Sequence, residues 1–258
     1  MTTIAIASGK GGVGKTTTVA NVGLALAKKG KSVLLIDADV AMANLSLVLG
    51  LGSSPITLHE VLLGDANIED AIYEGPAGID VIPSGLSLEN YRSLDSQRLS
   101  SVVTKIKSKY DFVLIDVAAG IEKSVQSAIE SADQVLIVVT PDSPSIADAL
   151  KTKIISQKLN SAPIGIIINL VRKTKGEIEK EKIMRVLELP SYGVIPFDED
   201  VRQLFLEGKQ QPIILRKPNS SASKAFNKIA LKITGVETPE KEEKESFLKS
   251  LLNKIFKK

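Results

Sequence analysis

The chain has 258 residues, of which 43% are hydrophobic and 24% charged, a composition typical of a globular protein that buries a sizeable core. It has no cysteine and a single histidine, His59, which excludes disulfides, thiolate zinc sites, cysteine-held iron–sulfur clusters and histidine-rich metal sites. The net charge of +3, from 33 basic and 30 acidic residues, is too small to indicate a nucleic-acid-binding protein.

Short runs of valine, isoleucine and leucine recur along the chain, and most are continuously apolar rather than alternating with polar residues. Continuous runs are typical of parallel strands that helices cover on both faces. The strands that this pattern predicts are residues 3–7, 32–36, 79–82, 111–115, 134–139, 164–168 and 193–195.

Helical segments separate these runs. They are expected at about 15–29, 97–108, 123–131, 144–159, 177–188 and 220–234. A shorter helical stretch at 58–63 contains His59, which we interpret as a packing or surface residue, and Ser143-Pro144 reads as a cap followed by a first-turn proline. Strands that alternate with helices at this spacing predict an α/β fold with a doubly wound, mostly parallel sheet flanked by helices.

A complete phosphate-binding pattern, G-x-x-x-x-G-K-[ST], follows the first predicted strand and opens the first predicted helix. Glycines let backbone N–H groups curl around phosphate oxygens, and the helix N-terminus adds partial positive charge. The lysine of the pattern would neutralise β- and γ-phosphates, and its threonine hydroxyl would hold Mg²⁺. A glycine-rich turn without a ligand is the simpler alternative. The residues of the pattern are Gly9, Lys10, Gly11, Gly12, Val13, Gly14, Lys15 and Thr16.

Lys10 is an addition that an ordinary phosphate-binding loop does not require. It is poorly placed for the phosphates held by its own loop, but it could reach the nucleotide of a neighbouring subunit, as an arginine finger supplied in trans does. A solvated surface lysine is the alternative interpretation.

Carboxylates follow two of the predicted strands. Asp37 and Asp39 come after 32–36, and Asp116 follows 111–115. Asp116 is expected to bind Mg²⁺ through water, Asp37 to lie near the metal, and Asp39 to orient the attacking water. Strand-end aspartates also serve simply as helix N-caps, and this alternative stays open.

The stretch from Ser8 to Thr17, SGKGGVGKTT, resembles the deviant Walker A motif of the MinD/ParA ATPases, and 36–45, IDADVAMANL, resembles the first switch segment of MinD. The resemblance covers residues 2 to about 235. It implies that the chain binds ATP and ADP with Mg²⁺, forms an ATP-dependent homodimer in which Lys10 contacts the partner's nucleotide, and hydrolyses ATP with Lys10, Lys15 and Asp39 as catalytic residues. Thr17 then belongs to the nucleotide site, and Asp116 to the second switch.

The resemblance also places the adenine pocket. Asn169 matches the base-recognising asparagine of the family, and the segment containing Pro196 and Asp198 matches the second edge of the pocket. One departure occurs in the second switch, where Ala118 replaces the usual proline. The replacement is expected to loosen a small, flexible run and to affect switching or hydrolysis rather than nucleotide binding.

Composition changes near the end of the chain. We expect an ATPase domain over 1–236, a charged tether over 237–245, and an amphipathic helix over 246–258. Large apolar residues of 247–256 fall on one half of a helical wheel and lysines on the other, a pattern that favours binding to anionic lipid. Docking onto a protein is the alternative.

Three functions are compatible with these features. The favoured one is a MinD-like ATPase, cytoplasmic and peripheral on the inner face of the cell membrane, which positions division or other machinery with the help of a protein activator and a cargo. The second is a ParA-like DNA-partitioning ATPase, for which the only support is the basic run 172–175, so DNA is an unlikely partner. The third is a regulator that has lost hydrolysis.

Overall fold

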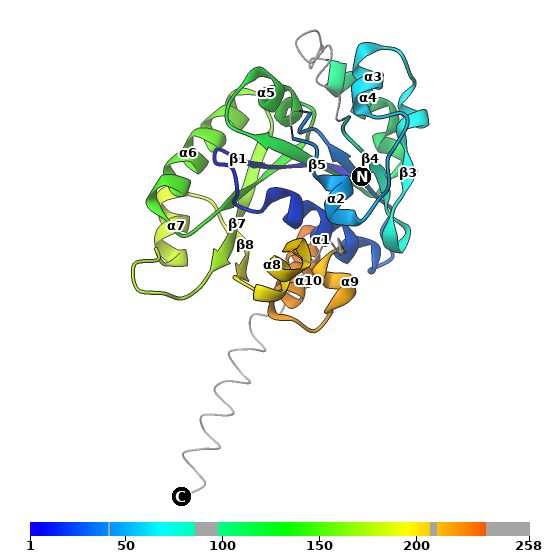
Figure 1. The fold of residues 1–258 in the computed structure, drawn as a ribbon. Helices are drawn as coiled ribbons and strands as arrows, with labels where there is room; N and C mark the ends of the chain where they lie inside the picture. Colours follow the sequence, from blue (N-terminus) through cyan, green and yellow to red (C-terminus); the bar gives the residue numbers. More distant parts are fainter. Residues whose placement is uncertain (41, 86–97, 207–210, 236–258) are drawn as a thin grey trace, which may run out of the picture.

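The computed structural model describes residues 1–40, 42–85, 98–206 and 211–235. Within these ranges eight strands form one sheet, in the spatial order β3-β4-β2-β5-β1-β6-β7-β8 (Figure 1). Neighbouring strands run parallel except β3 and β4. The strands are β1 Thr2–Ser8, β2 Val33–Asp37, β3 Tyr73–Glu74, β4 Asp80–Ile82, β5 Phe112–Ala119, β6 Gln134–Val139, β7 Ala162–Val171 and β8 Ser191–Pro196.

Helices cover both faces of this sheet (Figure 1). One face packs against α3 Leu58–Leu63, α4 Arg98–Ile106, α5 Lys123–Glu130, α6 Ser143–Lys158 and α7 Lys180–Leu187. The opposite face packs against α1 Lys15–Ala27, α2 Leu45–Leu49, α9 Ile213–Arg216 and α10 Ser221–Ile233. The helix α8 Glu199–Leu206 contacts α9, and short 3-10 turns lie at Ile68–Ala71, Pro76–Gly78 and Lys107–Lys109.

Burial explains why the central strands are continuously apolar. Every residue of β2 is buried, and β1 is buried from its second residue to its end. The two apolar layers on either side of the sheet are both closed by helices, so neither face of a central strand meets water. The predicted doubly wound, mostly parallel α/β fold is therefore confirmed.

Several elements differ from the sequence-based expectation. The strand β3 and the helices α2, α8 and α9 were not predicted. The elements β3, α2 and α9 are only two, five and four residues long, whereas α8 has eight residues, as many as the predicted α5 and α7. Asp142 rather than Ser143 caps α6, since its carboxylate accepts the Ser145 N–H at 2.9 Å. His59 packs inside the domain with 3% of its surface exposed. The predicted tether at 237–245 and helix at 246–258 lie outside the described residues, and so does residue 236.

Strand order places one crevice at the carboxyl end of β1. From β1 the chain passes through α1 to β2 on one side, whereas β5 leads through α5 to β6 on the other. In open α/β sheets, ligands bind at such a topological switch point. Among the residues described, no helix is both long and apolar enough to cross a bilayer.

Candidate nucleotide-binding site

The glycine-rich loop lies in that crevice, between the end of β1 at Ser8 and the start of α1 at Lys15. Gly12 and Gly14 adopt left-handed backbone angles, with φ of 75° and 87°, which side chains disfavour. Gly9 is required for a different reason, because a Cβ there would lie 2.6 Å from the carbonyl oxygen of Asp148 in α6. The loop is therefore folded into a turn that glycines at these three positions allow.

Lys15 begins α1 and is largely buried, with 9% of its surface exposed. Burial lowers the pKa of its ammonium group, while the carboxylates of Asp116 and Asp39 act in the opposite direction. The lowered pKa indicates that two nearby carboxylates do not fully compensate for desolvation. A further anion beside the ammonium group would favour its charged form.

Lys10 lies at the exposed start of the same loop. Its Nζ is 3.5 Å from Oδ1 of Asp142, and both side chains are more than two-fifths exposed. Burial acts to raise the pKa of Asp142, but hydrogen bonds from Thr140 and the Ser145 N–H, together with Lys10, lower it overall. An exposed ion pair of this kind contributes at most about 1 kcal/mol. Lys10 is therefore held only weakly within its own subunit.

Asp37 and Asp116 form the acidic centre of the crevice. They are register partners on the adjacent strands β2 and β5, and each is 1% exposed. Burial raises the pKa of Asp116 to about 7, with Asp39 adding to the increase and Thr16 and Lys15 opposing it. Burial and the proximity of Asp116 raise the pKa of Asp37 well above its usual range. Two buried acids side by side resist ionisation unless a cation joins them.

The chemistry of these residues fits Mg²⁺. Oδ1 of Asp116 is buried and has no hydrogen-bond partner, although buried carboxylate oxygens are normally satisfied. In the described part of the chain no cluster of three or more His, Cys, Asp or Glu residues could hold a metal alone. Mg²⁺ keeps several waters and takes one or two carboxylates together with phosphate oxygens, so it does not need such a cluster. Asp37, Asp116 and the Thr16 hydroxyl are the residues that would hold it.

Asp37 also organises the segment that follows β2. Its Oδ1 accepts the Asp39 N–H at 3.1 Å, and its Oδ2 accepts the Leu45 N–H at 3.1 Å, where α2 begins. Asp39 in turn accepts the Met42 N–H at 3.0 Å. Asp37 is not the N-cap of α2, which is Asn44, but its carboxylate accepts the first N–H of that helix in addition to lying beside Asp116. Asp39 is half-buried and keeps its other oxygen for a ligand or water.

The segment after Asp116 differs from the flexible run that the sequence suggested. The strand β5 continues through Ala119, which pairs with Ser8 of β1, and the Gly120 N–H lies 3.4 Å from the Ser8 carbonyl. Position 118 lies at a register shift in this pairing, between the pairs Ile6–Asp116 and Ser8–Ala119. The strand β5 therefore reaches the phosphate loop with Ala118 at an irregularity in its pairing.

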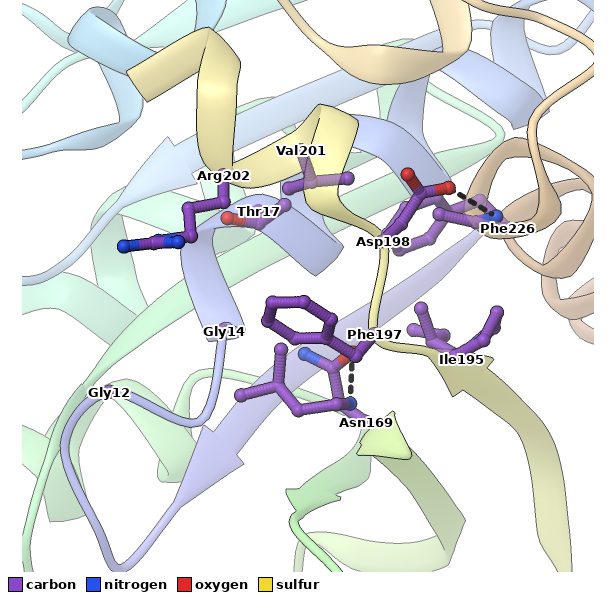
Figure 2. Close-up of a pocket in the computed structure, with 13 residues that line it drawn as sticks. Gly12, Gly14, Thr17, Asn169, Ile195, Phe197, Asp198, Val201, Arg202 and Phe226 are labelled. Atoms are coloured by element: carbon purple, nitrogen blue, oxygen red, sulfur yellow. Dashed lines mark hydrogen bonds between the residues drawn. The ribbon is translucent and has the colours of Figure 1, made fainter. Parts of the chain in front are cut away.

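A pocket of about 260 Å³ continues from the loop toward α10 (Figure 2). Gly12 and Gly14 line it at the loop, Thr17 lines it on α1, and Phe226 lines it on α10. The predicted base-pocket residues Asn169, Pro196 and Asp198 all contribute to its wall. The remaining lining residues are Leu170, Ile195, Phe197, Val201, Arg202 and Ala222.

The polar groups of this pocket are partly occupied by internal bonds. Oδ1 of Asp198 accepts the Asp200 N–H at 3.1 Å, and Oδ2 lies 3.3 Å from the Ala222 N–H and 3.2 Å from Ser221 Oγ. Asp198 therefore holds the start of α10 against the segment after β8.

Sequence reasoning missed several members of the wall. Val201, Arg202, Ala222 and Phe226 come from α8 and α10, which no local motif marks. The Arg172 guanidinium stacks on the Phe197 ring, with its Cζ 3.4 Å from the ring centroid. Arg172 therefore packs against the pocket wall. Only the clustering of apolar residues after Pro196 could have indicated such a wall.

Comparison with known proteins adds to this geometry. Residues 1–161 match a family model described as an AAA domain. An uncharacterized ATP-binding protein of Methanocaldococcus jannaschii is 45% identical over 255 residues, which cover 98% of this chain and 96% of that protein.

Two solved structures resemble the fold closely. The cell division ATPase MinD of Pyrococcus furiosus superposes with a TM-score of 0.87 at 39% identity, covering 92% of this chain and 99% of that one. The septum site-determining protein MinD of Pyrococcus horikoshii, complexed with Mg-ADP, gives a TM-score of 0.85 at 39% identity, covering 90% and 95%.

Proposed function

This chain belongs to the MinD/ParA family of P-loop ATPases, and from that premise we propose that it is a MinD-like ATP hydrolase. Its cofactors are ATP, ADP and Mg²⁺. It dimerises when Mg-ATP is bound, occupies a membrane surface in that state, and leaves the membrane after hydrolysis. The cycle would position division or other machinery in the cell, through an activating protein and a cargo.

One observation carries the hydrolytic part of the proposal, namely the buried pair Asp37 and Asp116 beneath a complete phosphate-binding loop. The loop N–H groups and Lys15 bind the phosphates, and Thr16 and the two aspartates hold Mg²⁺. Mg²⁺ held by these residues would neutralise negative charge that develops on the phosphates during transfer. Asp39, which follows β2 at the same crevice, orients the water that attacks.

Lys10 supports the dimeric part of the proposal. Its only ion pair in the described residues is the weak, exposed contact with Asp142, so little free energy opposes its transfer to a partner's nucleotide. The side chain starts at the exposed rim of the loop, where a second subunit could approach. Lys10 would then stabilise negative charge on the phosphates across the interface.

The membrane part rests on the sequence of the last residues, which lie outside the described ranges. A single short amphipathic helix binds lipid weakly, whereas two copies in one dimer gain avidity. This dependence on dimerisation would link the nucleotide state to a peripheral position on the inner face of the membrane.

The test is co-sedimentation with vesicles containing anionic lipid, in Mg-ATP and in Mg-ADP. We expect the full chain to sediment with vesicles only in ATP. Leu251→Glu, on the apolar half of the predicted helix, should abolish sedimentation, and Ser250→Glu, on the polar half, should preserve most of it. Equal sedimentation in both nucleotides, or equal loss in both variants, would refute the membrane cycle.

A parallel arm with DNA in place of vesicles tests the ParA-like alternative. Two contacts weigh against a free basic patch at 172–175: Arg172 packs on Phe197, and Glu177 accepts the backbone N–H groups of Arg172 and Lys173 at 2.9 and 2.8 Å. ATP-dependent retention on DNA but not on vesicles would favour partitioning instead.

A further inference from the structure

Asn169 lies where β7 reaches the phosphate loop. The pairing of β7 with β8 passes from Ile168–Val194 to Val171–Pro196, so β7 contains one extra residue there. Leu170, within this bulge, has φ of 58°. Bulges re-aim side chains and are frequent beside functional sites. Asn169 itself is 4% exposed and points at the loop rather than along the regular ladder.

Two hydrogen bonds fix the orientation of the Asn169 amide. Its Nδ2 donates to the carbonyl oxygen of Val13 at 2.8 Å, and its Oδ1 accepts the Leu170 N–H at 2.8 Å. A flipped amide would place an oxygen against the Val13 carbonyl and an NH₂ against the Leu170 N–H, and both contacts would then be repulsive. The bond to Val13 joins residues that are 156 positions apart in the chain.

This bond sets the direction of one peptide group in the phosphate loop. The peptide between Val13 and Gly14 is planar and trans, as the chain has no cis peptide in the residues described. In a trans peptide the C=O and N–H point in opposite directions. When Asn169 holds the Val13 carbonyl, the Gly14 N–H must therefore point away from Asn169.

The close approach of Asn169 also explains why residue 14 is a glycine. A Cβ on residue 14 would collide with Nδ2 of Asn169. The left-handed φ of 87° at this position is a second reason why glycine is required. Gly14 is the N-cap of α1, and the structure gives it no side-chain cap bond. The amide of Asn169 thus occupies the place of a side chain at the junction of loop and helix.

We propose that Asn169 is a positioning residue for the phosphate loop, which it holds in its binding conformation before any nucleotide arrives. The proposal rests on the proposed nucleotide-binding function and extends it, because a base-recognising residue alone would not affect how the loop grips phosphate. The amide retains one donor hydrogen and one acceptor lone pair beyond its two internal bonds, so it can contact a base at the same time. Asn169 thereby couples the base pocket to the phosphate site.

The first test compares ATP with inorganic tripolyphosphate, which has no base, by calorimetry in Mg²⁺. Asn169→Ala should weaken both ligands, and tripolyphosphate by about two- to tenfold, as expected for one neutral hydrogen bond. Phe197→Leu, which alters the pocket wall without touching the loop, should weaken ATP alone. An Asn169→Ala variant that loses ATP affinity but binds tripolyphosphate like the wild type would overturn the proposal.

The second test needs no ligand. Hydrogen exchange of the loop peptide covering residues 9–17 should be several-fold faster in Asn169→Ala and in the isosteric Asn169→Asp. The aspartate keeps an acceptor for the Leu170 N–H, but it replaces the donor to Val13 by a charged oxygen that repels the Val13 carbonyl. Exchange in Phe197→Leu should match the wild type, and unchanged exchange in both Asn169 variants contradicts the proposal. This measurement uses nucleotide-free protein. It therefore separates failure of the Asn169–Val13 hydrogen bond to hold the loop from failure of ATP binding itself.

Discussion

Replacing Asp116 by asparagine should stabilise the nucleotide-free protein at alkaline pH while it impairs Mg-nucleotide binding. Asp116 is fully buried beside Asp37, and burial raises its pKa to about 7 from an ordinary value of 3.8. Between these two values the folded state keeps a proton that the unfolded state has lost. The contribution of Asp116 to stability therefore declines as pH rises from about 4 to about 7, and above that it is a constant penalty.

The size of that penalty follows from the pKa difference. About three pKa units correspond to about 4 kcal/mol as an upper limit. Asparagine removes the charge and also relieves Asp37, but its amide hydrogens need partners in the same buried space. We therefore expect Asp116→Asn to gain about 2–3 kcal/mol at pH 8, and this gain should disappear as pH approaches 4.

Urea unfolding in EDTA, with nucleotide removed, measures this directly at pH 8, 6 and 4.5. Asp80→Asn is a suitable control, since Asp80 is a partly buried acid that accepts a hydrogen bond from Tyr110 away from the crevice. A stability gain for Asp116→Asn that does not depend on pH, or a loss at pH 8, would refute the electrostatic reasoning.

Three further predictions concern the same crevice. Asp39→Asn keeps an acceptor for the Met42 N–H but loses the negative charge. Nucleotide binding should persist, whereas the rate of single-turnover hydrolysis should fall about 100-fold or more. An unchanged rate would show that Asp39 has no catalytic role. Gly9→Ala forces a Cβ against the Asp148 carbonyl, so it should lower the free energy of unfolding by about 1–3 kcal/mol and also weaken nucleotide binding. Wild-type stability together with wild-type affinity would contradict the close approach. Affinity for Mg-ADP should fall by about ten- to a hundredfold per pH unit below about pH 7, because Asp116 and Asp37, whose pKa values are both raised, must release their protons to hold Mg²⁺. This fall is steeper than protonation of the nucleotide explains, and a flat calorimetric profile would disprove the coupling.

Local sequence predicted the parts of the fold that local physics determines. The strands β1, β2 and β6 are buried on both faces, and such burial leaves a run of apolar residues that is visible without any structure. The phosphate loop was likewise predictable, since its glycines, Lys15 and Thr16 lie within eight residues. The carboxyl ends of parallel strands meet at one edge of the sheet, so the proximity of Asp37 and Asp116 also followed from sequence.

Contacts between distant segments could not be predicted in this way. The Asn169 bond to Val13 depends on a bulge in β7, and no residue pattern marks that bulge. Arg172 and Phe197, which follow β7 and β8 respectively, come together only in the folded chain, where the guanidinium packs over the ring. The four-residue helix α9 is too short to be stable by itself, so its position depends on tertiary packing. The prediction for the last residues of the chain stays untested by the structure.

The central claim is that the N-terminal glycine loop binds Mg-ATP through Lys15. Calorimetry on the full chain with Mg-ATP tests it most directly, with Lys15→Ala compared with Lys158→Ala, an exposed lysine on α6. We predict measurable binding by the wild type and by Lys158→Ala, and at least about thirtyfold weaker binding by folded Lys15→Ala. No binding by the wild type, or equal affinity in the two variants, would contradict the account.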